Sequence, residues 1–136
     1  MLAEKIAEGY GKAEDFNCAE MILNGANEAY GLDLDEKALK LAGGFGGGFG
    51  IESVCGALCG CVMTLSRLLI NTVAHQTKDL RRYEEELLKG YEAEMGSILC
   101  KDLKRDYRTE DKGCAYVIEM AAEYLDQAVE RIRRGE

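Results

Sequence analysis

Apolar residues recur every three or four positions along most of the chain, which is the period of an amphipathic α-helix. No segment alternates apolar and polar residues as a half-buried strand does, and the chain contains no proline to interrupt helices. The pattern therefore predicts an all-α fold. The clearest example is a charged helix that begins near Lys78 and carries one apolar stripe, made of Leu80, Tyr83, Leu87, Tyr91 and Met95.

Capping signals divide the first part of the chain. Two pairs have the form of a capping box, Asn17 with Glu20 and Asp33 with Glu36. They predict a helix over 18–30, with Cys18 as its first residue, and a shorter helix that stops at Gly43. A short helix over 2–10 precedes both.

The second part is expected to hold a buried central helix over 54–70, with Ser53 as its N-cap. Its uninterrupted apolar run is shorter than the roughly 20 residues that a bilayer span needs. The polar stretch 102–112 is expected to be loop or frayed helix, and a last helix is expected over 111–134. We predict one domain over 1–136, a bundle of about five or six helices with a glycine-rich loop before the central helix.

That loop is the only low-complexity segment and covers 43–50, Gly-Gly-Phe-Gly-Gly-Gly-Phe-Gly. Its glycines permit positive φ angles and leave backbone N–H groups free to face an anion or a sulfur atom. Neither the dinucleotide fingerprint nor the P-loop fits, because no lysine follows and no strand precedes. We expect four backbone positions to contact a cofactor: Gly46, Gly47, Gly48 and Gly50.

Charge and composition narrow the function. The net charge is −8 and the basic residues are interleaved with acids, so no positive face is available for nucleic acid. Residues 1–6 lack the apolar run of a secretion signal, and we expect a cytoplasmic protein without stable membrane insertion. Helical exteriors of this length could pair two copies into a homodimer.

Six cysteines against a single histidine, His75, are the strongest chemical feature. Thiols stay reduced in the cytoplasm, where cysteines are more often catalytic or metal-bound than structural. Helix starts present unpaired N–H groups and a positive dipole end, which favour thiolate over thiol. Four cysteines fall in the first turn of predicted helices: Cys18, Cys55, Cys100 and Cys114.

Three interpretations of the cysteines stay open. Four thiolates from facing helices can hold an iron–sulfur cluster or another thiophilic metal such as zinc. Alternatively, a metal-free protein can use Cys55 with Cys59, or with another helix-start cysteine, as a dithiol and disulfide pair. In the third interpretation the thiols only pack, and the chain is a noncatalytic helical interaction module.

The chain resembles the C_GCAxxG_C_C family of small four-cysteine proteins, which are regarded as redox-active. Residues 55–60, Cys-Gly-Ala-Leu-Cys-Gly, fit the family's Cys-Gly-Ala-x-x-Gly motif, and the glycine and phenylalanine run over 43–50 is also typical. Cys18, Cys100 and Cys114 match the other three family cysteines. Related domains occur in larger electron-transfer proteins, so the resemblance implies redox activity and favours the iron–sulfur interpretation.

We therefore expect an electron-transfer protein that holds an iron–sulfur cluster, with zinc or no cofactor as alternatives, and that works with a redox partner protein. Cys18, Cys55, Cys100 and Cys114 would be the thiolate ligands. The chain departs from the family at Cys59, a variable motif position, and at Cys61. Cys59 lies one turn after Cys55 and is expected as an additional ligand or a resolving thiol. No catalytic residue or substrate is assigned.

Overall fold

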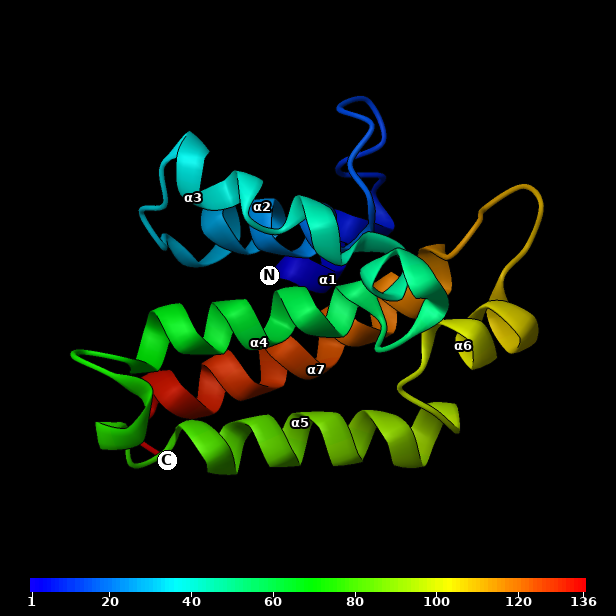
Figure 1. Cartoon of the computed structure of the whole chain (residues 1–136). Coiled ribbons are helices and arrows are strands. Elements are labelled where there is room, and N and C mark those ends of the chain that lie inside the picture. Colours follow the sequence, from blue (N-terminus) through cyan, green and yellow to red (C-terminus); the bar gives the residue numbers. More distant parts are fainter.

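Helices and their connections make up the whole chain in the computed structural model, which describes residues 1–136 and contains no strand (Figure 1). The prediction of an all-α fold is confirmed, with a helix count close to the expected five or six. The α-helices are α1 (Leu2–Ala7), α2 (Cys18–Tyr30), α3 (Glu36–Lys40), α4 (Gly56–Leu69), α5 (Leu80–Met95), α6 (Cys100–Tyr107) and α7 (Ala115–Arg133). Three short helical turns connect them: η1 (Gly43–Phe45), η2 (Gly48–Glu52) and η3 (Ala74–Gln76).

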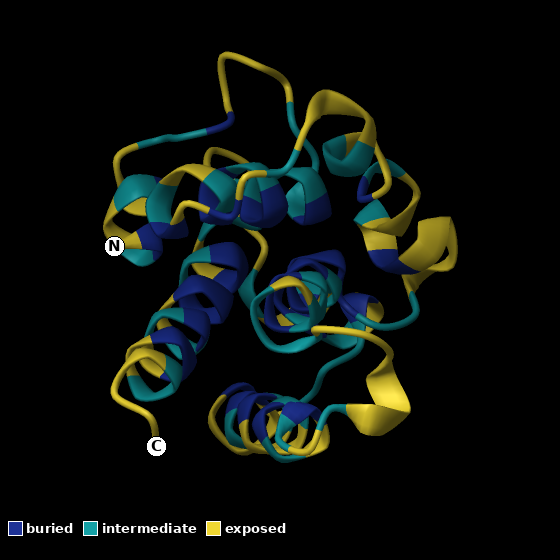
Figure 2. Ribbon diagram, turned by 90° about the vertical axis from the view of Figure 1, so that its left-hand side faces the viewer, coloured by how far each residue is buried: buried dark blue, intermediate teal, exposed yellow.

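The central helix α4 lies beside α7, and the other long helices pack around this pair (Figure 1). On one side, α5 contacts both α4 and α7. On the other side, α2 packs along α4 while α1 packs along α7. Figure 2 shows that the buried faces of these helices point toward one another. One core therefore runs between all of them, and the small helices α3 and α6 lie at its margins.

The apolar stripe of α5 is buried along its entire length, as its sequence predicts. Tyr91 is fully buried, and its hydroxyl donates a hydrogen bond to the Val117 carbonyl of α7 at 3.2 Å. Gly96 ends the helix in the left-handed conformation at φ 90°. None of the helices combines the length and the apolar composition needed to span a bilayer.

The capping box at the start of α2 is also confirmed. The Asn17 side chain accepts a hydrogen bond from the Glu20 N–H, and the Glu20 carboxylate accepts one from the Asn17 N–H, both at 3.0 Å. The second predicted box is wrong. Asp35 caps α3 by accepting from the Ala38 N–H at 2.8 Å, whereas Asp33 lies outside the helix with φ 56°.

Other helix starts also differ from the predicted ones. Ser53 is not the cap of α4, because the chain is still extended at Cys55, which takes the N-cap position itself. The last helix begins at Ala115, so Cys114 is its N-cap residue. Most importantly, the stretch 102–112, expected as loop or frayed helix, is helical as far as Tyr107, as part of α6, which begins at Cys100.

Asp126 joins three helices near the N-terminus. Its carboxylate accepts hydrogen bonds from the N–H groups of Leu2 and Ala3, both at 2.9 Å, at the start of α1. The Tyr30 hydroxyl, from the last residue of α2, donates to the same carboxylate at 2.6 Å. A side chain of α7 thus satisfies the exposed amides of α1 and fixes α1 and α2 against the last helix.

Candidate functional site

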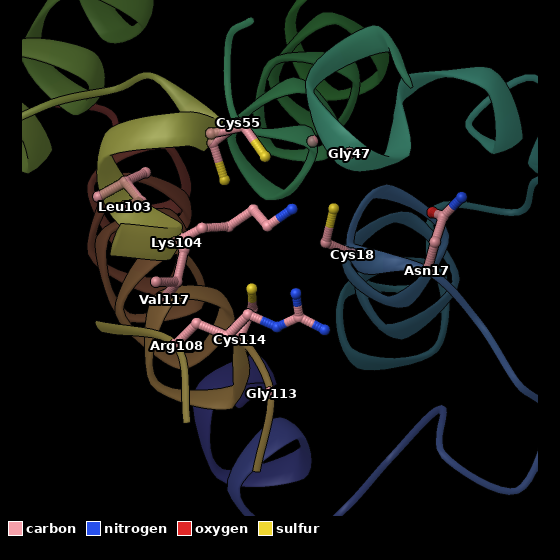
Figure 3. A pocket seen from close by; sticks show the side chains of 12 residues that line it. Asn17, Cys18, Gly47, Cys55, Leu103, Lys104, Arg108, Gly113, Cys114 and Val117 are labelled. Carbon is pink, nitrogen blue, oxygen red and sulfur yellow. The ribbon is translucent and has the colours of Figure 1, made fainter. Parts of the chain in front are cut away.

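The four family cysteines line one cavity of about 350 Å³, which we call the four-thiol cavity (Figure 3). Its lining comes from α2, the glycine loop, α4, α6 and α7. Figure 3 shows the sulfur atoms of Cys18, Cys55 and Cys114 directed toward a common space. The twelve lining residues are Asn17, Cys18, Gly47, Cys55, Gly56, Cys100, Leu103, Lys104, Arg108, Gly113, Cys114 and Val117.

A short backbone pairing holds Cys55 and Cys100 together. Val54 and Leu99 form an antiparallel bridge, and the residues beside them complete it. The Cys55 N–H donates to the Ile98 carbonyl at 2.8 Å, and the Cys100 N–H donates to the Ser53 carbonyl at 2.6 Å. Two cysteines that are 45 positions apart thus flank one small bridge, where α4 and α6 begin.

The glycines of the Cys-Gly-Ala-x-x-Gly motif allow α4 to approach α2. A β-carbon at position 56 would lie 2.5 Å from the Cys18 sulfur and 2.7 Å from the Phe45 carbonyl oxygen. A β-carbon at position 60 would lie 2.9 Å from two side-chain carbons of Ile22. These distances are shorter than real β-carbon contacts, so Gly56 and Gly60 are needed for close packing.

The glycine loop is fixed mainly by contacts with the protein. Among the four glycines expected to contact a cofactor, only Gly47 lines the four-thiol cavity. Gly46 packs against the Asn17 side chain, whose amide also donates to the Gly43 carbonyl at 2.9 Å. Gly48 has φ 62°, and a β-carbon there would lie 2.8 Å from the Cys100 β-carbon. Gly50 has no neighbouring atom within 4 Å of such a carbon.

Cys114 reaches the cavity through the turn between α6 and α7. Thr109 and Gly113 form a second small bridge, with the Gly113 N–H donating to the Thr109 carbonyl at 2.8 Å and the return bond at 3.1 Å. Gly113 has φ 57°, a left-handed conformation that glycine adopts without strain. This turn brings Cys114, the residue directly before α7, back toward α6 and into the cavity lining.

Burial dominates the acidity of the cavity thiols. It raises the pKa of Cys55 to about 12, although the backbone N–H groups of Leu58 and Ala57 oppose the shift. Burial also raises the pKa of Cys100 and of Cys114. The expectation that helix starts favour thiolate is therefore wrong for these three residues, because desolvation outweighs the helix-end amides. Without a ligand, these thiols are neutral at neutral pH.

The remaining two cysteines lie elsewhere. Cys59 lines a separate apolar pocket of about 250 Å³ with Phe45, Met63 and Leu88, and burial raises its pKa to about 11. Cys61 is fully buried in the core, where its thiol donates to the Ala121 carbonyl at 3.5 Å. The structure thus brings four of the five expected ligands to one cavity, whereas Cys59 lines a different pocket, with Cys18 near enough to contribute to its raised pKa.

Two basic residues of the cavity escaped the sequence analysis. Lys104 and Arg108 both line it, and they follow Cys100 at intervals of four residues. That spacing places the three side chains on one face of a helix. The spacing is visible in the sequence, but it has this meaning only once residues 100–107 are known to be helical.

No group of three or more His, Cys, Asp or Glu side chains is arranged so that it could hold a single metal ion. Four ligands of one ion must converge on one point, as in tetrahedral zinc sites. The cysteines of a polynuclear cluster bind different irons and surround a larger volume. In the four-thiol cavity the thiols line a common space, and no three of them are grouped closely enough to hold a metal ion.

Comparison with known proteins agrees with the arrangement of the cysteines. Residues 16–128 match the family model described as "Putative redox-active protein (C_GCAxxG_C_C)", which spans all four cavity cysteines and the glycine loop. No curated protein and no solved structure matches the chain. Because the family match covers most of its length, the chain belongs to the C_GCAxxG_C_C family.

Proposed function

We propose that the four-thiol cavity holds an iron–sulfur cluster and that the protein transfers electrons. The observation that supports this proposal is the convergence of four thiols, from four separate segments of the chain, on one cavity. Four cysteine thiolates are the usual ligand set of such clusters. The volume of about 350 Å³ lies within the range of small-ligand and cofactor sites. A single zinc ion fits less well, because no three side chains could share one ion.

The protein residues would have defined roles. Cys18, Cys55, Cys100 and Cys114 would bind as thiolates, and the raised pKa values of the last three mean that loading must release protons. The backbone at Gly47 lines the cavity and could donate hydrogen bonds to sulfur, which tunes a cluster's potential. The cluster would supply one-electron transfer. A redox partner protein in the reducing cytoplasm would deliver or accept the electron.

The test is anaerobic purification followed by measurement of iron, acid-labile sulfide, visible absorption and the paramagnetic resonance of the reduced protein. We expect iron and sulfide in equal amounts, and a loss of most of both in each single Cys→Ser variant at positions 18, 55, 100 and 114. The matched control is Cys59→Ser, which removes a thiol outside the cavity and should keep the full content. Absence of iron and sulfide after anaerobic reconstitution, or equal loss in Cys59→Ser, would overturn the proposal.

A second function, thiol–disulfide exchange, is favoured by the bridge between Val54 and Leu99, which brings the segments of Cys55 and Cys100 to the lining of one cavity. In this reaction the two thiols become one disulfide, and a substrate disulfide takes up the two electrons and two protons. Mild oxidation of the metal-free protein should then yield a Cys55–Cys100 disulfide, detected by peptide mass analysis. Cross-links distributed equally among all six cysteines would contradict this function.

A further inference from the structure

The four-thiol cavity carries two positive charges and no negative ones. Lys104 and Arg108 are its only charged lining residues, and the remaining lining consists of thiols, glycines, one amide and two aliphatic side chains. The whole chain, by contrast, has a net charge of −8. Two positively charged side chains therefore lie where the thiols converge, although the protein as a whole is acidic.

Both cations come from one short element. Residues 104 and 108 are one turn apart, at the end of α6 and just after it. Figure 3 shows the Lys104 ammonium pointing toward the space between Cys55 and Cys18, and the Arg108 guanidinium beside Cys114.

The two cations differ in their partners. The Lys104 ammonium lies 2.8 Å from the Glu52 carboxylate of η2, which is not among the lining residues. The Arg108 guanidinium forms no salt bridge and no side-chain hydrogen bond. The charge of Lys104 is thus partly neutralised by Glu52, whereas Arg108 keeps its full charge and its free hydrogen-bond donors.

We propose that Lys104 and Arg108 form an anion subsite within the four-thiol cavity, so that the group engaged by the thiols is a negatively charged, sulfur-containing one. This inference deepens the proposed function and rests on it for the role of the thiols. An iron–sulfur cluster with four thiolates carries net negative charge, and so does an acidic disulfide. Both are sulfur-containing groups with a net negative charge, and the two cations would stabilise either one.

The test compares two disulfide reagents on the reduced, metal-free protein. One is dianionic, 5,5′-dithiobis(2-nitrobenzoate), and the other is neutral, 4,4′-dithiodipyridine. Each reaction forms one mixed disulfide, releases one aromatic thiolate and frees one proton from the attacking cysteine. Peptide mass analysis gives the rate at each cavity cysteine, and each rate is divided by that of a free cysteine peptide with the same reagent.

We expect the ratio of anionic to neutral rates at Cys114 to fall by about fivefold in the double variant Lys104→Gln with Arg108→Gln. It should fall little in Lys101→Gln, which removes one positive charge from an exposed position of the same helix. High salt should abolish the difference, because mobile ions screen the two charges. An unchanged ratio in the double variant, or an equal fall in Lys101→Gln, would overturn the anion subsite.

Iron content separates this result from the proposed function. If wild-type protein binds iron and sulfide and the double variant binds less than half as much, the anion is the cluster. If wild-type protein binds no iron but keeps its preference for the anionic reagent, the proposed cluster fails while the subsite stands, and the anion is an acidic disulfide. If the cluster binds equally in both proteins and the reagent ratio is unchanged, the subsite fails while the proposed function stands.

Discussion

Gly56 at the start of α4 touches Cys18 at the start of α2, because a β-carbon at position 56 would stand only 2.5 Å from the Cys18 sulfur. The same carbon would also meet the carbonyl of Phe45 in the glycine loop. One glycine therefore sets how closely the central helix, the loop and a cavity thiol approach one another.

Replacement Gly56→Ala should destabilise the protein by about 1–2 kcal/mol, because the overpacking cost exceeds the gain in helix propensity. It should also displace the Cys18 sulfur and change the labelling rate of that thiol. Urea unfolding and peptide mass analysis measure the two effects. The control is Gly44→Ala, where a β-carbon would meet nothing within 4 Å and φ is not positive. Equal stability of the two variants would contradict the packing role of Gly56.

The raised pKa of Cys55 predicts a loss of stability in alkali for the metal-free protein. The unfolded chain releases this thiol proton near pH 8.5, whereas the folded chain keeps it until about pH 12. The stabilisation is complete below pH 8.5 and is lost as the pH rises, by about 1.4 kcal/mol per pH unit for one thiol. Urea unfolding between pH 7.5 and 10.5 should show this slope, and Cys55→Ala should flatten it. An identical slope in Cys55→Ala would show that other groups cause the loss.

Loss of the Asp126 carboxylate, which does not line the four-thiol cavity, should greatly reduce the stability of the fold. Replacement Asp126→Ala leaves the N–H groups of Leu2 and Ala3 and the Tyr30 hydroxyl without their shared acceptor. We expect a loss of about 3 kcal/mol in the free energy of unfolding, measured in urea. Tyr30→Phe removes one of the three hydrogen bonds and should cost about 1 kcal/mol. A smaller loss in Asp126→Ala than in Tyr30→Phe would exclude this anchoring role.

Glu52 should weaken the attraction of the cavity for anions, because its carboxylate pairs with Lys104. In Glu52→Gln the ratio of anionic to neutral reagent rates at Cys100 and Cys114 should rise about twofold. The matched control is Glu92→Gln on the exposed face of α5, which changes the net charge equally and pairs with no cation. A rise of the same size in this control would attribute the effect to overall charge.

Much of the fold could be predicted from the sequence because its determinants are local. The stripe of α5 follows the helical period, and the capping box of α2 joins residues only three apart. The start of α6 depends on distant partners instead. Its first N–H, that of Cys100, donates to the Ser53 carbonyl across the small bridge, and its sequence is mostly polar. This is why the part of α6 after Cys100 was expected as loop or frayed helix.

The cavity was predictable only in part for the same reason. Its four cysteines were found because they stand beside recognisable helix starts and in the family motif. Lys104 and Arg108 were missed because their common face exists only when α6 is helical. Cys59 was included because it shares a face with Cys55, but residue 55 precedes the helix as its N-cap, so the helical spacing does not bring their thiols together.

The bridge between Thr109 and Gly113 also determines when the site can form during biosynthesis. Cys114 follows this turn directly and comes 96 positions after Cys18. A growing chain that ends before the turn can present at most three of the four thiols. Loading of the proposed cluster would therefore require nearly the whole chain, because a product that terminates before Cys114 would lack one of the four thiols.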